Sequence, residues 1–113
     1  MLNQAIIVGK VAKEITLNET QDRKQVSNII LEVKRSFKNE HGTYDSDFIH
    51  CTLWSGIAVN AAQHCQVGSV IGVKGRIKTK YIEIPNGQSI PVSEVVAEKI
   101  TFISKTNNDK NLN

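Results

Sequence analysis

The sequence predicts an all-β fold, a five-stranded barrel with one short helix between strands 3 and 4. Segments rich in Val, Ile and Thr alternate along the 113 residues with clusters of Gly, Asn, Asp and Ser, a pattern typical of short antiparallel strands. One segment in the second half instead has small apolar residues at helical spacing. Together these observations place one helix after three strands and before two.

Each strand is bounded by turn residues. The strands are expected at about residues 4–12, 26–38, 44–54, 69–81 and 90–103. Residues 18–24 are polar and are interpreted as a loop. Residues 39–42 predict a hairpin turn, because Gly42 can adopt a positive φ. Asn86-Gly87 predicts a two-residue type I′ turn between the last two strands.

The helix is predicted from residues at positions i, i+3, i+4 and i+7, which are Ala58, Ala61, Ala62 and Cys65. Ser55 is its expected N-cap and Gly68 its expected terminator. The order strand, strand, strand, helix, strand, strand is that of the OB-fold, a Greek-key barrel whose face and loops bind oligonucleotides or oligosaccharides.

The length indicates a single domain, residues 1–104, followed by a polar tail at 105–113 that is expected to be disordered. Cys51 and Cys65 make no disulfide framework, so reduced core thiols are expected. The sequence has neither a signal-peptide pattern nor the roughly 20 apolar residues that span a bilayer. A cytoplasmic protein is therefore expected.

The third strand divides its side chains between two faces by period-two alternation. The face toward the core is expected to hold Ile49, Cys51 and Leu53. The opposite face is expected to hold Phe48, His50, Thr52 and Trp54. Phe48 and Trp54 are two large rings on the face opposite the core, which favours a binding role for them. Burial in an interface is the alternative.

Cations follow the fourth strand. Its outward face is expected to carry Lys74, Arg76, Lys78 and Lys80, while Val73, Gly75 and Ile77 point inward. A second group consists of Lys34, Arg35 and Lys38, and Lys10 ends the first strand. Although the net charge is only +3, local stripes matter more for a polyanion. Aromatic rings can stack on bases and cations can bind phosphates, so their combination indicates a groove for single-stranded nucleic acid. The alternative is a solvated charged face.

Several segments resemble the bacterial single-stranded DNA-binding proteins, especially the short paralogues that some Gram-positive bacteria carry. The resemblance runs from Met1 to about Ser104 and is carried by residues 2–10, 27–37, 47–54, 58–69 and 75–80. The last of these is similar to the family's Gly-x-Leu/Ile-x-Thr/Ser-Arg run. Each segment alone is weakly specific, but their combination is specific.

The resemblance implies a homotetramer of OB-folds, associated with the nucleoid, that wraps single-stranded DNA without sequence preference. DNA replication, repair, recombination or uptake would use such binding. Stacking roles would fall on Phe37, Phe48, Trp54 and Tyr81. The predicted phosphate-binding residues are Lys10, Lys34, Arg35, Lys38, Lys74, Arg76, Lys78 and Lys80.

Two features depart from the family pattern. Alternation puts Tyr81 on the face opposite Lys80, so a bulge or the hairpin turn would have to redirect it. Many members end in an acidic, hydrophobic tip that recruits other proteins. Here the tail has one acid, Asp109, and ends in Leu112-Asn113, which puts recruitment by such a tip in doubt.

Other functions receive less support from the residues. A dimeric primosome-type OB module that recruits replication proteins is the nearest alternative, and a small nuclease is one of another class. No Walker motif, catalytic triad or acidic cluster is present. His50-Cys51 and His64-Cys65 lack the two-to-four residue spacing of a zinc knuckle. The sequence therefore predicts no enzyme activity, no metal and no cofactor.

Overall fold

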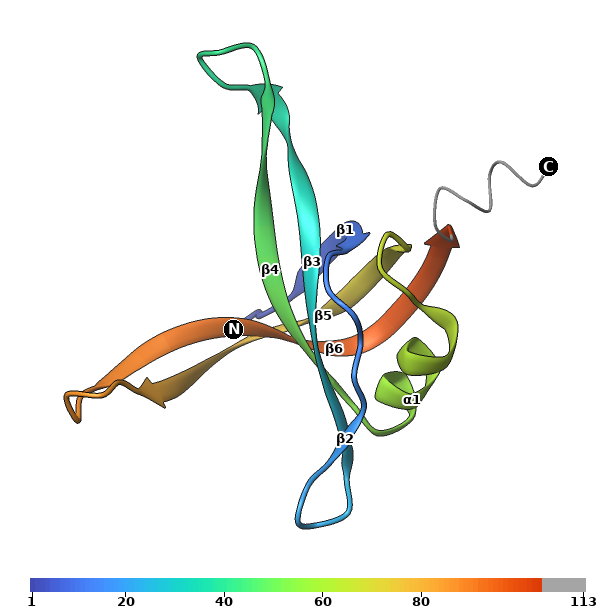
Figure 1. The fold of residues 1–113 in the computed structure, drawn as a ribbon, viewed down its shortest axis with the longest axis vertical. Helices are drawn as coiled ribbons and strands as arrows, with labels where there is room; N and C mark the ends of the chain where they lie inside the picture. The colour runs from blue at the N-terminus through green and yellow to red at the C-terminus, as the bar shows by residue number, and fades with distance from the viewer. Residues whose placement is uncertain (105–113) are drawn as a thin grey trace.

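The computed structural model describes residues 1–104, so the predicted tail at 105–113 lies outside the described part. The elements in chain order are β1 (Ala5–Val11), β2 (Asn18–Glu19), β3 (Gln25–Lys38), β4 (Tyr44–Trp54), α1 (Ser55–His64), β5 (Val70–Glu83) and β6 (Ser89–Ser104) (Figure 1). No helix among these residues is long and apolar enough to cross a bilayer.

The five long strands form a closed barrel with α1 between the third and fourth of them, which confirms the predicted OB-fold. The sheet order is β1-β5-β6-β4-β3-β2, and β1 also pairs with β3 to close the barrel. The strand pairings that close the barrel involve only a few residues. β4 and β6 pair in parallel only at Cys51–Val95 and Thr52–Val96, and β1 pairs with β3 only at Lys10–Glu32 and Val11–Leu31.

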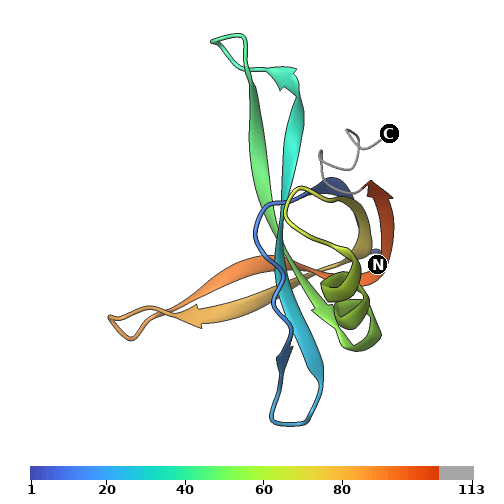
Figure 2. The same ribbon diagram turned by 45° about the vertical axis from the view of Figure 1, so that its right-hand side comes forward.

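Three hairpins within residues 1–104 project from this barrel and share one turn plan (Figures 1 and 2). In each, backbone hydrogen bonds close a three-residue loop, between Thr20 and Lys24, Asn39 and Thr43, and Ile84 and Gln88. The third loop residue has a positive φ, which is 62° at Arg23, 81° at Gly42 and 87° at Gly87. This is the three-residue hairpin loop whose last residue is left-handed.

Two turn predictions are corrected by these hairpins. Residues 18–24 are not simply a loop, because β2 pairs with the start of β3 and a tight turn joins the two strands. The type I′ prediction for Asn86-Gly87 is wrong, because Gly87 has a positive φ but Asn86 does not. Asn86 instead accepts a hydrogen bond from the Gln88 amide at 2.9 Å through its side chain.

The helix begins one residue earlier than its predicted cap implied. β4 continues to Trp54, which is the N-cap residue in extended conformation without a side-chain cap, so the N-cap assigned to Ser55 is wrong. Ser55 has φ 54°, which turns the chain from strand to helix within one residue. The helix ends at His64, and Gly68, the expected terminator, lies beyond it in the following turn with φ 93°.

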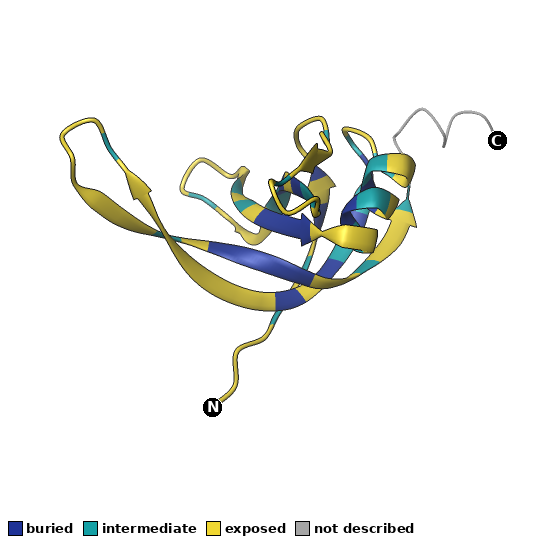
Figure 3. Ribbon diagram, turned by 90° about the horizontal axis from the view of Figure 1, so that it is seen from below, coloured by how far each residue is buried: buried dark blue, intermediate teal, exposed yellow. Residues whose placement is uncertain are grey.

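The core fills the middle of the barrel, and the long hairpins β3–β4 and β5–β6 leave it as arms (Figure 1), the second of them mostly exposed (Figure 3). Its largest fully buried side chains come from β1, β3, β4 and β5, and Ala58 and Ala61 of α1 join them. Beyond the core, β5 and β6 form a two-stranded ribbon with no layer behind it. Ile77, which was expected to point inward, is therefore about half exposed.

Gly75 marks the place where the β5–β6 ribbon leaves the barrel. The register of β5 against β6 shifts between Lys74 and Gly75. A Cβ atom at Gly75 would collide with the backbone oxygen of Val96. Only glycine permits so close a strand approach, which explains its place inside the cationic run.

Candidate nucleic-acid interface

Two predicted stacking rings stand on the outer face of β4. Phe48 is 58% exposed and Trp54 39% exposed, while Ile49, Cys51 and Leu53 turn toward the core. His50 lies between the two rings in sequence and is also exposed. Thr52 shares this face but is buried beneath neighbouring side chains. The face therefore presents flat apolar rings to solvent, separated by polar groups.

The other two predicted rings lie on the arms. Phe37 is exposed on the β3–β4 arm, close to the register irregularity between Lys34 and Lys38. Tyr81 is exposed on the β5–β6 arm. The register shifts of β5 lie at Val70/Ile71 and Lys74/Gly75, so no bulge redirects Tyr81. Its ring remains on the face opposite Lys78 and Lys80.

The aromatic strand β4 and the cationic strand β5 are separated by β6. A chain of side-chain contacts crosses that strand. The Thr52 hydroxyl lies 2.6 Å from Oε2 of Glu94, and the Lys80 ammonium lies 3.2 Å from the same oxygen. Trp54, Thr52 and Lys80 therefore belong to one face of the sheet, a connection that the sequence alone did not establish.

Acidic side chains of β6 lie beside the cationic run Lys74 to Lys80 of β5. β5 itself carries no acid between Lys74 and Lys80, but β6 supplies Glu94 to Lys80 and Glu98 to Arg76, the latter at 3.5 Å. Lys74 and Lys78 form no ion pair within residues 1–104. The four predicted phosphate-binding cations of β5 therefore differ, because Arg76 and Lys80 have acidic partners on the neighbouring strand.

Arg35 is also held by acids. It makes two hydrogen bonds to the Asp47 carboxylate, at 3.1 and 2.9 Å, and approaches Asp45 at 4.0 Å. The hydrogen bond from Arg35 lowers the pKa of Asp47. All three side chains are about half exposed, so solvent weakens the pairing. Lys38, further along β3, lies 6.0 Å from the centre of the Tyr44 ring.

Two further predicted phosphate ligands, Lys10 and Lys34, lie in the lining of one hollow of about 340 Å³ between β1 and β3. β1 and β3 pair only at Lys10–Glu32 and Val11–Leu31, and the hollow lies beside these pairs, toward Val8 and Lys34, where the two strands are no longer paired. Its wall includes Glu32, whose carboxylate accepts a hydrogen bond from the Ser46 hydroxyl at 2.8 Å. Neither lysine forms an ion pair within the described chain, so both ammonium groups are available to an anion.

Glu94 is the residue of this site that sequence reasoning missed. Burial alone would raise the pKa of its carboxyl group, but the Thr52 hydroxyl, Lys80 and the charge of Lys78 together lower this pKa. Glu94 is therefore ionised at neutral pH. An acid next to the apolar run Val95-Val96-Ala97 was the available signal, because a charge buried among strand side chains needs a partner.

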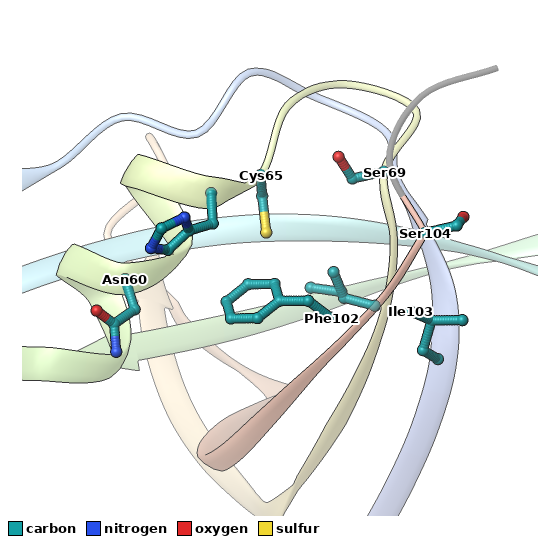
Figure 4. Close-up of a pocket in the computed structure, with 8 residues that line it drawn as sticks. Asn60, Cys65, Ser69, Phe102, Ile103 and Ser104 are labelled. Carbon is teal, nitrogen blue, oxygen red and sulfur yellow. The ribbon is translucent and has the colours of Figure 1, made fainter. Parts of the chain in front are cut away.

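A separate cavity of about 460 Å³ lies between α1 and the end of β6 (Figure 4). Phe102 lines it and is about half exposed, so this aromatic ring is not a buried core residue. Its ring meets the His64 ring edge-on, with centroids 5.7 Å apart. His64 is the last residue of α1, so the helix covers only one side of the Phe102 ring and leaves the ring partly exposed.

The two cysteines of the described chain are not activated thiols. Burial raises the pKa of the Cys51 thiol to about 11 and also raises that of Cys65, so both thiols are protonated at neutral pH. Within residues 1–104, His, Cys, Asp and Glu side chains form no group of three or more that could hold a metal ion.

The sequence matches known proteins over nearly its whole length. A model of the single-strand binding protein family matches residues 2–103. The chain is 39% identical to single-stranded DNA-binding protein B of Bacillus subtilis over 110 residues, covering 97% of each chain. It is 36% identical to single-stranded DNA-binding protein 3 of Streptococcus agalactiae, covering 100% of this chain and 82% of the relative. The chain therefore belongs to the single-strand binding protein family.

Proposed function

We propose that this protein binds single-stranded DNA without sequence preference and protects it, by binding alone and without a catalytic step. The observation that carries the proposal is the pair of exposed rings, Phe48 and Trp54, on the sheet face that also bears the β5 cations. Rings accept any base by stacking, because every base has a flat π-face. Membership of the single-strand binding protein family supports the same function.

The aromatic rings would bind the bases and the cations would bind the phosphates. Bases stack on Phe48 and Trp54 at the barrel and on Phe37 along the β3–β4 arm, each stack contributing about 1 to 3 kcal/mol. Phosphates are bound first by those predicted phosphate-binding lysines that have no ion pair within residues 1–104, which are Lys10, Lys34, Lys38, Lys74 and Lys78. Arg35 and Arg76 contribute once their exposed pairs with acids open.

Tyr81 would contact DNA from the other face of the β5–β6 arm. Because this arm is exposed on both faces, a strand that passes around it can meet Lys78 on one face and Tyr81 on the other. Duplex DNA keeps its bases stacked inside the helix, so the rings cannot reach them. Preference for single strands then follows from the need to stack.

We propose that the protein assembles as a homotetramer. Ile6 and Val8 of β1 are 73% and 53% exposed. Gly72 of β5 leaves room between Val8 and Ile103, which extends an apolar surface across three strands. In addition, β1 pairs with β3 only at its last two residues, so most of one β1 edge is unpaired in the described chain. Apolar patches and open edges of this kind favour self-association.

Sequence-independent binding suits any process that exposes single strands. We infer that the protein acts in DNA replication, repair, recombination or uptake, in the cytoplasm and on the nucleoid. The inference rests on the proposed DNA binding and on the single-stranded DNA-binding proteins to which the chain is similar.

The test uses Trp54, the single tryptophan of the sequence. Titration with poly(dT) should quench its emission, and the affinity should fall steeply with salt as counterions are released. Trp54→Ala and Phe48→Ala, followed by fluorescence anisotropy of a labelled oligonucleotide, should each weaken binding by about 1 to 3 kcal/mol.

Tyr44→Ala is the matched control, because Tyr44 is an exposed ring on β4 that receives no stacking role. It should leave the affinity within about twofold of the wild type. Unchanged tryptophan emission, together with undiminished binding by Trp54→Ala and Phe48→Ala, would contradict the proposed stacking surface. Equal binding of duplex and single-stranded DNA would contradict the proposed function itself.

A further inference from the structure

Glu94 is the one charged residue among the buried residues of the described chain, with 8% of its surface exposed. It lies on β6, the strand between the aromatic β4 and the cationic β5. A carboxylate at this place repels the phosphates that the surrounding lysines would attract. Its presence on a DNA-binding face therefore needs a physical explanation.

The Glu94 carboxylate contacts one hydroxyl group and one ammonium group. Its Oε2 atom lies 2.6 Å from the Thr52 hydroxyl and 3.2 Å from the Lys80 ammonium. If Lys80 moved away to a phosphate, a buried carboxylate would keep one neutral hydroxyl and the more distant charge of Lys78. Leaving a buried charge without its partner is strongly unfavourable. Lys80 is therefore far more firmly held than its exposed position suggests.

The Arg76–Glu98 pair on the same two strands behaves differently. Both of its side chains are about half exposed, and the charged atoms lie 3.5 Å apart. Water can solvate Glu98 when Arg76 leaves it, so that pair opens at little cost. The two pairs involve neighbouring strands and equal charges, and they differ mainly in the burial of the acid.

We propose that Glu94 withholds Lys80 from the phosphates and so sets the affinity and salt dependence of DNA binding. The inference rests on the proposed binding of single-stranded DNA. Lys80 serves as a structural cation that neutralises Glu94, while Lys78, which has no ion pair within residues 1–104, remains free to contact a phosphate. Glu94 thus limits the number of cations that the arm offers to a strand.

The experiment measures the affinity for a dT oligonucleotide across a salt series. Each phosphate contact to a single strand adds about 0.7 to the slope of log K against log salt, which is about fivefold in affinity at 0.1 M salt. Glu94→Gln keeps an oxygen for Thr52 but frees Lys80, so the slope should steepen by about 0.7 and binding tighten about fivefold. The double variant Glu94→Gln/Lys80→Gln should return the slope to the wild-type value.

Single lysine variants test the other half of the proposal. Lys80→Gln should leave the slope unchanged, whereas Lys78→Gln should flatten it by about 0.7. Glu14→Gln is the charge-matched control, because Glu14 is exposed and forms no ion pair within residues 1–104. It changes the net charge as Glu94→Gln does and should not steepen the slope. Circular dichroism establishes that each variant is folded at the temperature of the titration.

Two results would overturn the proposal: a wild-type slope in Glu94→Gln, or a slope that Lys80→Gln flattens as much as Lys78→Gln does. The lysine comparison decides the question alone if Glu94→Gln does not fold. Failure of the proposed function is distinguishable, because the wild-type protein would then show no salt-dependent binding of dT, before any variant is compared.

Discussion

At the scale of single residues, the partner of a cation decides its role more than its position does. Arg35 and Lys80 both belong to predicted phosphate tracks, yet each contacts an acid that lies far along the chain, Asp47 and Glu94 respectively. A count of charges along one strand cannot include acids from its neighbours. For this reason the sequence indicates where cations lie along each strand but not which of them have acidic partners on a neighbouring strand.

Gly75 provides a stability prediction at this scale. Gly75→Ala should lower the free energy of unfolding by about 3 kcal/mol or more, because the new Cβ would collide with the Val96 carbonyl oxygen and force β5 and β6 apart. Chemical denaturation followed by circular dichroism measures the change. The loss should be large although only one methyl group is added.

Gly56→Ala is the matched control, since a Cβ there meets no atom within 4 Å. Gly56 lies in α1, where alanine favours the helix by about 1 kcal/mol over glycine. This variant should be neutral or stabilised. Equal destabilisation by both changes would show that the close approach at Gly75 has no special cost.

At the scale of elements, segments rich in Val, Ile and Thr and bounded by turn residues predicted the five long strands to within about two residues of their ends. The signal is local, because each strand carries its own alternation and turn residues. What it missed depends on backbone conformation, as at Ser55 and Arg23, whose positive φ values no side-chain pattern announces. Ile77 shares the face of Val73 and Gly75 as expected but is about half exposed, because alternation does not reveal how much of the core lies behind a strand.

The contact network between β4, β6 and β5 gives a pH prediction. The pKa of Glu94 is lowered in the folded protein, so its contribution to stability is present above the ordinary carboxyl pKa and is lost as the pH falls through the folded value. Glu94→Gln should cost about 1.5 to 3 kcal/mol at pH 7, the usual range for hydrogen bonds to a charged group. The difference from the wild type should shrink as the pH falls below about 4.

Urea denaturation of both proteins at pH 7, 5, 4 and 3 measures that difference. Asp47→Asn is the comparison variant, because the pKa of Asp47 is also lowered but its carboxylate is half exposed. Its effect at pH 7 should be smaller than that of Glu94→Gln. A gap between Glu94→Gln and the wild type that stays constant across the series would contradict the assignment of a stabilising charge to Glu94.

At the scale of the whole molecule, the element order was enough to predict the OB-fold, but not which strands lie side by side. The placement of β6 between β4 and β5 follows from barrel closure, which involves residues far apart in sequence, such as Cys51 and Val95. The hollow that brings Lys10 and Lys34 together arises in the same way. Faces of single strands were predictable from the sequence, whereas the surface that they form together was not.

The proposed assembly gives the prediction at this scale. Ile6→Asp/Val8→Asp should break the homotetramer, because burying two carboxylates in an apolar interface without partners is costly. Size-exclusion chromatography with light scattering should give four times the chain mass of 12.5 kDa for the wild type. The variant should give a smaller species.

Val67→Asp is the control, since Val67 is an exposed apolar residue in the turn after α1, and this turn makes its backbone hydrogen bonds to β1 at Val11, not at Ile6 or Val8. It should leave the assembly intact. A monomeric wild type, or a double variant with unchanged mass, would contradict the proposed interface. A wild-type dimer that binds DNA weakly would instead support the alternative of a primosome-type module.

The three hairpins that end in the same kind of loop have a consequence for how such a protein can change. Each loop is closed by its own two strands, and the arms have no core layer behind them. Adding two residues to each strand of an arm would lengthen it by about 7 Å and keep every side chain on its original face. The length of DNA covered can therefore evolve through the arms while the barrel and its stability stay the same.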